Sequence, residues 1–131
     1  MLNRICFIGT IGKEPEIRKT QTGVSVMSID IACKRDRKEN GENVVDWITT
    51  VFWRGSADFL ANYAHKGDVV AVEGRLQSRK WTDKDGKNRI NWEVQADSVS
   101  IVKHKPIEEK TAEETHYEVI EETEEPGDLP F

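Results

Sequence analysis

The residues best suited to chemistry are tryptophans that share one face of a predicted strand. Trp47 and Trp53 lie six residues apart in run 46–54, whose aromatic and β-branched residues predict a strand. Strand side chains alternate between faces, so both indoles lie on the face of Thr49 and Val51. Exposed indole rings stack on flat ligands such as nucleic-acid bases. The alternative is that both faces are buried, as in a central strand.

Basic residues recur close to a third tryptophan. One face of the predicted strand 68–81 carries Arg75, Arg79 and Trp81. Cations neutralise phosphates while an indole stacks on a base, a combination typical of proteins that bind single strands without reading their sequence. The charged loop 34–43 is a second candidate for phosphate binding, with a solvated turn as its alternative. The basic residues expected to contact phosphates are Arg35, Arg37, Lys38, Arg75, Arg79, Lys80, Lys84, Lys87 and Arg89.

The sequence offers no constellation for catalysis or for a metal. Cys6 and Cys33 lie in apolar runs without metal-ligand spacing, and the three histidines are scattered. Asp46 and Glu73 are the only acids well placed within predicted strands, and no paired-carboxylate spacing supports them. We therefore expect no metal, no cofactor and no enzymatic activity. A metal-dependent nuclease is a competing hypothesis.

Charge is distributed unevenly along the 131 residues, whose net charge is −5. Residues 106–131 hold ten acids and one base, and residues 1–105 hold fourteen acids and eighteen bases. The mildly basic domain suits a polyanion ligand. The acidic tail is expected either to compete with that polyanion or to recruit basic partners. The sequence contains no apolar run long enough for a membrane span or a signal peptide, so we expect a cytoplasmic protein.

The elements that must position these residues are short strands. A helix that begins with Ser56 as its N-cap and closes at Gly67 is expected between the third and fourth strands. Asn40-Gly41 and Asp85-Gly86 predict hairpin turns, and Gly74 predicts a bulge or sharp bend. This pattern predicts an all-β, five-stranded OB-fold Greek-key barrel. The predicted strands are residues 3–11, 24–34, 46–54, 68–81 and 89–102.

Two further aromatic residues are assigned to packing, and the acidic tail is assigned to disorder. Trp92 is expected in the core or at a subunit contact, and Tyr63 in the helix packing. From residue 106 the periodic apolar pattern stops, so the domain is predicted to span 1–105 and the disordered tail 106–131. The tail ends in Asp128, Leu129, Pro130 and Phe131, interpreted either as a random end or as a motif that docks on another protein.

Taken in order, these residues resemble bacterial and phage-type single-stranded DNA-binding proteins. The resemblance covers about residues 2–103 and the last four residues. In the loop 34–38, where that family often has an aromatic residue, this chain has only charged residues. The residues that carry the resemblance are Asn3, Arg4, Ile5 and Gly9; Pro15 to Arg18 and Gly23; Trp47, Val51, Trp53 and Ala57; Tyr63, Lys66 and Gly67; Val72 to Leu76; Arg79 to Trp81; Asp85 and Gly86; and Glu93 and Val94.

The resemblance implies an assembly, a ligand and partners. It implies OB-folds that form a homotetramer, or dimers of such domains, with single-stranded DNA wrapped over the barrels. By position, the base-stacking aromatics of the family fall on Trp47, Trp53 and Trp81. The tip of the tail is implied to recruit proteins of replication, recombination and repair. An adaptor that works mainly through its tail and a protein that prefers RNA remain alternatives.

Overall fold

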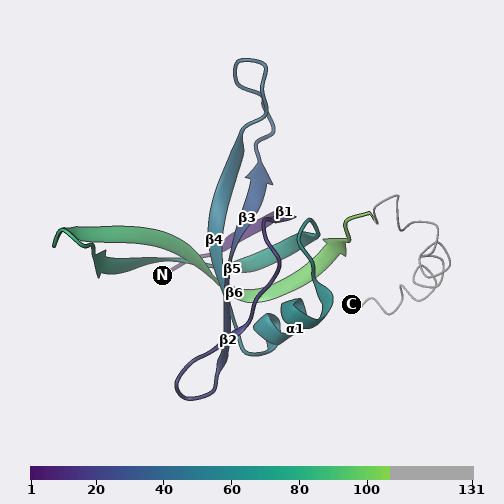
Figure 1. The fold of residues 1–131 in the computed structure, drawn as a ribbon. Helices are drawn as coiled ribbons and strands as arrows, with labels where there is room; N and C mark the ends of the chain where they lie inside the picture. Colours follow the sequence, from purple (N-terminus) through teal and green to yellow (C-terminus); the bar gives the residue numbers. More distant parts are fainter. Residues whose placement is uncertain (107–131) are drawn as a thin grey trace.

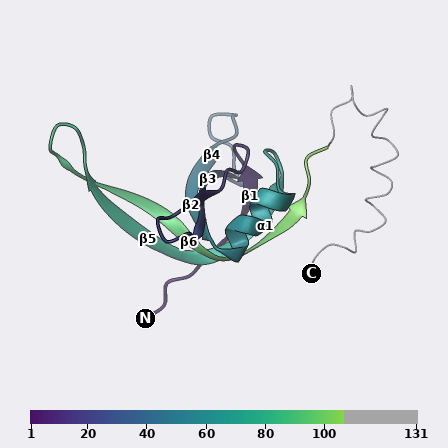
Figure 2. The same ribbon diagram turned by 60° about the horizontal axis from the view of Figure 1, so that its bottom comes forward.

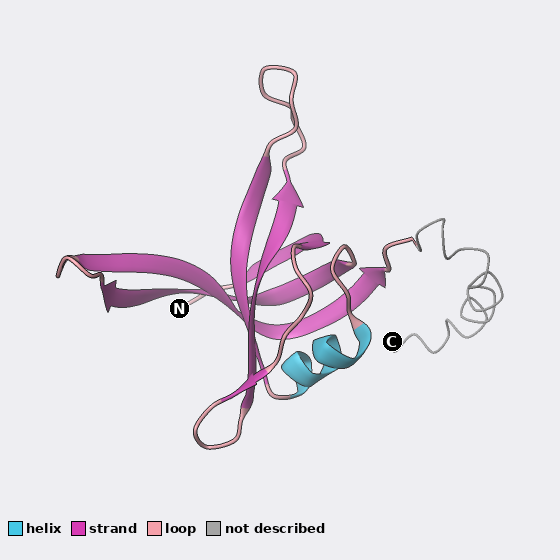
Figure 3. Cartoon of the chain, viewed as in Figure 1, coloured by secondary structure: helices cyan, strands magenta, loops and turns pink. Residues whose placement is uncertain are grey.

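The computed structural model describes residues 1–106, and within them β-strands dominate (Figure 1, Figure 3). One helix, α1, lies between the third and fourth long strands, as predicted. A two-residue strand, β2, is additional to the five strands expected, and it pairs with the start of the next strand. The elements are β1 (Ile5–Ile11), β2 (Arg18–Lys19), β3 (Ser25–Lys34), β4 (Val45–Trp53), α1 (Gly55–Tyr63), β5 (Val69–Thr82) and β6 (Asn88–Lys103).

The five long strands close into a barrel. Their order is β1-β5-β6-β4-β3, and the end of β1 pairs with β3 through Thr10 and Ile11. All neighbours are antiparallel except β4 and β6, which are parallel and touch through two residue pairs, Thr50 with Val94 and Val51 with Gln95. This closed path with one helix after the third long strand is the OB-fold, so the predicted fold class is confirmed.

Alternation along the strands places the core inside this barrel. Ile29, Ile31 and Phe52 are fully buried, since they lie on the inward faces of β3 and β4. Helix α1 lies across one end of the barrel (Figure 2) and contributes Leu60 and Ala57 to the same cluster. Burial of this apolar surface is the main force that holds the strands together.

The predicted helix boundaries are wrong at both ends. The helix begins at Gly55 after Arg54, whose φ of 51° lies in the left-handed region, and no side chain caps it. Arg54 still donates its backbone N–H to Ser25, so strand pairing, rather than a Ser56 cap, sets where the helix begins. The helix ends at Tyr63, and Gly67 instead belongs to the following turn, where its N–H donates to the carbonyl of Ile11.

Glycine permits a bulge and a tight turn, as predicted. The β5–β6 register shifts between Glu73 and Gly74. A Cβ at Gly74 would lie 2.2 Å from the carbonyl oxygen of Gln95, so no side chain fits there. At the tip of the hairpin between β3 and β4, Asn40 and Gly41 have φ of 55° and 80°, as a type I′ turn requires. Both positions therefore depend on local backbone geometry that the sequence already indicated.

Two hairpins project from the barrel in different directions (Figure 1). One joins β3 to β4, and we call residues 34–43 the charged hairpin. The other is formed where β5 and β6 continue to pair beyond the bulge, as far as Thr82 with Asn88. We call residues 75–95 the arm. Most of its side chains are exposed, whereas Glu93, Val94 and Gln95 are buried at its base, where β4 meets β6.

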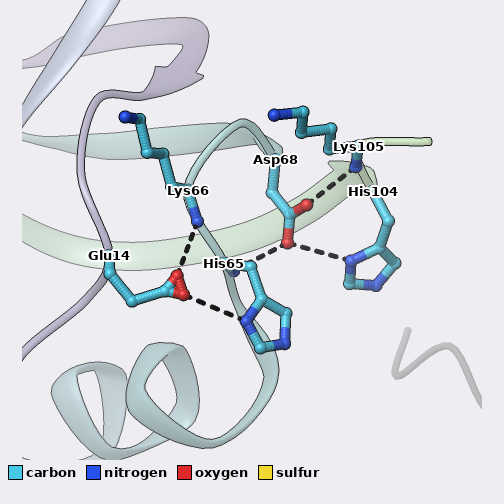
Figure 4. A network of polar contacts seen from close by, with 6 residues as sticks. All are labelled: Glu14, His65, Lys66, Asp68, His104 and Lys105. Atoms are coloured by element: carbon cyan, nitrogen blue, oxygen red, sulfur yellow. Dashed lines mark hydrogen bonds and ion pairs between the residues drawn. The ribbon is translucent and has the colours of Figure 1, made fainter. Parts of the chain in front are cut away.

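A buried carboxylate fastens the end of β6 to the barrel (Figure 4). Asp68 is 2% exposed and accepts hydrogen bonds from the backbone N–H groups of His65 and Lys105, and its carboxylate lies 2.9 Å from Nδ1 of His104. Beside it, Glu14 accepts from the N–H of Lys66, and this bond together with the His65 ring lowers the pKa of Glu14. These contacts fix the position at which the chain leaves the barrel.

Candidate nucleic-acid interface

The outward face of β4 exposes both of its tryptophans. Trp47 is 60% exposed and Trp53 is 41% exposed, whereas Thr50 and Phe52, on the other face, are fully buried. Val51, between the two indoles, is buried by its neighbours. The alternative in which both faces of this strand are buried is therefore wrong for the two tryptophans.

The two indoles have different supports. Trp47 packs against Gly12, where an added Cβ would lie 2.6 Å from Cζ3 of the indole. Trp53 instead donates its indole N–H to Oε1 of Gln95 at 2.8 Å. Since Gln95 belongs to β6, this hydrogen bond joins two strands that are far apart in the sequence.

A groove runs between this outward face and the base of the arm. It is hollowed between β3 and β4 on one side and the arm on the other. Its basic residues Lys13 and Arg18 were missed by the sequence analysis, because they lie in the segment between β1 and β3 and carry no pattern of their own. The lining includes Lys13, Arg18, Thr49, Trp53, Arg79 and Asn91.

The arm presents one tryptophan on each face. Trp81 is 43% exposed and pairs across the arm with Arg89, while Arg79 lies on the same face two residues away. Trp92 is 61% exposed and lies on the opposite face, which it shares with Ile90. A core position for Trp92 is therefore wrong, because the inward face of the barrel becomes an exposed face once β6 passes the barrel wall. The alternative expectation, a subunit contact, stays a prediction.

The predicted phosphate-binding cations fall into two groups. Arg35 is held by Asp46 at 2.9 Å and by Glu39 at 3.1 Å, and the guanidinium lowers the pKa of Asp46. Arg79 and Arg89 also meet carboxylates, at 3.0 and 2.8 Å. Within residues 1–106 no ion pair is found for Arg37, Lys38, Arg75, Lys80, Lys84 and Lys87.

The acids that hold these arginines belong to the two hairpins, except Asp46, which lies at the start of β4. The pKa of Asp83 is lowered, first by the hydrogen bond from Arg89 and then by the backbone N–H groups of Lys87 and Asp85. Asp83 therefore organises the tip of the arm as well as neutralising Arg89. An arginine paired in this way must exchange a carboxylate for a phosphate, so it gains less from the ligand than an unpaired lysine does.

The described residues contain neither a group of side chains that could ligate a metal nor a helix that could cross a membrane. Histidine, cysteine, aspartate and glutamate side chains in residues 1–106 form no group of three that could hold a metal ion. In the same range, no helix is long and apolar enough to cross a membrane. The predicted docking residues Asp128, Leu129, Pro130 and Phe131 lie outside the described residues.

The chain is similar in sequence to one protein family and to several of its bacterial members. Residues 2–102 match the model of the single-strand binding protein family. The chain is 36% identical over 119 residues to single-stranded DNA-binding protein 2 of Listeria monocytogenes, which covers 90% of this chain and 74% of that protein.

Two further relatives match over a shorter share of their length. A single-stranded DNA-binding protein of Oceanobacillus iheyensis is 41% identical over 106 residues, or 80% of this chain and 66% of that protein. Single-stranded DNA-binding protein A of Bacillus subtilis is 38% identical over 106 residues, or 80% of this chain and 62% of that protein. The match to these two thus spans just under two thirds of their length.

Proposed function

Since the chain belongs to the single-strand binding protein family, we propose that it binds single-stranded DNA without sequence preference and without catalysis. The observation that carries this proposal is the exposure of Trp47, Trp53 and Trp81. Cations lie beside Trp53 in the groove and beside Trp81 on the arm. Every base has a π-face, so stacking on indoles tolerates any sequence. Each stacked tryptophan contributes about 1–3 kcal/mol by analogy with alanine substitutions in other proteins of this type.

Phosphate contacts come from both projecting hairpins and from the groove. The predicted cations without an ion pair bind phosphates directly, whereas Arg35, Arg79 and Arg89 do so only by releasing a carboxylate. Each phosphate neutralised on a single strand changes the slope of log K against log salt by about −0.7. Lys13 and Arg18 join this set, since they line the groove beside Trp53.

Copies of the chain assemble through a face that carries no tryptophan. The outer surface of β1, β5 and β6 forms a shallow hollow lined by Cys6, Ile8, Ala71, Ser98 and Ser100. Ile8 is exposed there although it is a large apolar residue, and a second copy would cover it. The homotetramer follows from the family resemblance, and this face leaves the tryptophans free for DNA.

In the cell, this binding protects single strands during replication, recombination and repair. The terminal residues Asp128 to Phe131 recruit enzymes of these processes through their apolar side chains and carboxylates. The protein acts in the cytoplasm, at the nucleoid of a bacterium or in the host cell if a phage encodes it.

Tryptophan fluorescence during titration with long oligo-dT tests this proposal. We expect strong quenching, tight binding to dT and weak binding to duplex DNA of equal length. Little quenching, or equal affinity for the duplex, would contradict stacking and leave only a general polyanion surface. An oligo-U strand of the same length tests the RNA alternative, and incubation of labelled dT with Mg²⁺ tests for nuclease activity.

A further inference from the structure

Trp53 is the tryptophan whose indole N–H has a fixed partner, and that partner is itself fixed. We propose that Gln95 is a positioning residue of the single-stranded DNA site, which holds the Trp53 ring in its stacking orientation before DNA arrives, and that Glu93 holds Gln95. This inference rests on the proposed function for its ligand. The anchoring itself is a property of the free protein.

The contacts form a chain of three hydrogen bonds from an indole to a guanidinium. Trp53 Nε1 donates to Oε1 of Gln95 at 2.8 Å, and Nε2 of Gln95 donates to Oε2 of Glu93 at 2.6 Å. The same Glu93 oxygen accepts from Arg79 at 3.0 Å. Two residues assigned to the DNA site, Trp53 and Arg79, are therefore joined through two residues that sequence reasoning did not select.

The direction of this chain is fixed by chemistry. An ionised carboxylate accepts only, so the amide nitrogen of Gln95 faces Glu93 and its oxygen faces the indole. Glu93 is 6% exposed and Gln95 is 8% exposed, so water competes little for either. The carboxylate of Glu93 is paired with the guanidinium of Arg79, so its buried charge is not left uncompensated.

The other tryptophans lack such an anchor. Among residues 1–106, no hydrogen-bond acceptor is found for the indole nitrogen of Trp47, Trp81 or Trp92. A side chain that is ordered before binding loses less entropy when a base stacks on it, so the same contact yields a higher affinity. The anchor also occupies the polar edge of Trp53, so this ring offers bases only its π-surface and cannot discriminate between them.

Hydrogen exchange of the indole N–H groups tests the anchor without DNA. In ¹⁵N spectra of the wild-type chain, we expect the Trp53 indole proton to exchange with solvent more slowly than those of the other three tryptophans. In Gln95→Met, which keeps the length of the side chain but replaces the amide oxygen with a thioether that is only a weak acceptor, Trp53 should exchange about as fast as Trp47. An unprotected Trp53 proton in the wild type would overturn the proposal.

A double-mutant cycle on oligo-dT affinity tests the consequence for binding. We expect Gln95→Met to weaken binding about three- to tenfold, as for one side chain that must be immobilised on binding. In a Trp53→Phe background, which keeps a stacking ring but has no indole N–H, Gln95→Met should weaken oligo-dT binding less than twofold. Gln77→Met, an exposed glutamine on the same face of the arm, is the matched control and should also cost less than twofold.

The outcomes separate this inference from the proposed function. If the wild type does not bind dT, the proposed function fails, while the exchange measurement still decides whether Trp53 is anchored. If the wild type binds but Gln95→Met binds equally well, or loses as much in the Trp53→Phe background, Gln95 does not act through Trp53. Thermal unfolding midpoints of all variants ensure that the comparison is made on folded protein.

Discussion

The charged hairpin and the arm both project from the barrel (Figure 1), yet their side chains differ. Residues 34–43 contain four bases, three acids and no aromatic residue, and Arg35 is already held by two acids. Residues 75–95 contain six bases, three acids and two tryptophans. Charge alone attracts DNA at long range and is screened by salt, whereas stacking acts at contact and is much less sensitive to salt. We therefore expect the two hairpins to contribute to different observables.

The largest effect should come from removing the bend that directs the arm. In Gly74→Ala, the new Cβ would meet the backbone of Gln95 and Ala96, which cannot move without separating β5 from β6. We expect a loss of about 3 kcal/mol of unfolding free energy, at the upper end of overpacking effects. Urea denaturation measures it. Gly86→Ala, at the exposed tip of the arm, is the comparison, because this glycine has open space around it but a positive φ. It should lower the free energy of unfolding by less than Gly74→Ala does.

A smaller loss should follow Trp81→Ala, which removes stacking from the arm and leaves its charge intact. We expect oligo-dT binding to weaken by about 1–3 kcal/mol and fluorescence quenching to fall. The salt slope should remain that of the wild type. Trp92→Ala, on the opposite face of the arm, is the matched control, and an equal loss there would show that the two faces do not differ.

The converse change in the charged hairpin should weaken binding chiefly at low salt, and so reduce the salt dependence, without removing any stacking. Arg37→Ala/Lys38→Ala removes two cations that have no ion pair within residues 1–106, so the negative slope of log K against log salt should become less steep by about 1.4 if each binds one phosphate. Quenching at saturation should not change. Titrations at several salt concentrations provide both quantities, and an unchanged slope would mean that these side chains are merely solvated.

The smallest effect should come from Arg35→Ala, because Asp46 and Glu39 already neutralise Arg35. Its DNA affinity should change less than that of Arg37→Ala. The pKa of Asp46 is lowered in the folded chain, so this pair stabilises the fold above the unfolded pKa of about 3.9 and the contribution is lost as pH falls through the lower folded value. A carboxyl ¹³C titration of Asp46 should therefore show a higher pKa in Arg35→Ala. An unchanged titration would contradict the pairing.

The sequence could predict whatever depends on local periodicity. Alternation in 46–54 correctly separates the faces of Trp47 and Phe52, and the Asn40-Gly41 and Gly74 signals are confirmed because backbone sterics at those positions allow few alternatives. What it could not predict depends on how distant segments meet. The hydrogen bond between Trp53 and Gln95 crosses 42 residues and exists only because β4 and β6 close the barrel.

Two wrong expectations have a similar cause. Ser56 has the chemistry of an N-cap, but the pairing of Arg54 with β3 determines where the helix begins, so tertiary contacts override the local preference. For Trp92, alternation indicates which face of β6 carries the side chain. It does not indicate where along the strand the barrel ends and the arm begins.

The parallel contact between β4 and β6 has a consequence for motion. It joins the strands through two residue pairs, whereas β5 and β6 pair through fourteen, so the barrel should fluctuate open more readily along this seam than between β5 and β6. Gln95 lies on one side of the seam and Val51, next but one to Trp53, on the other. Each opening would therefore release the indole, and each closing would restore it. A base stacked on Trp53 would favour the closed barrel, so that DNA binding would slow the opening of the fold at this sparsely paired joint.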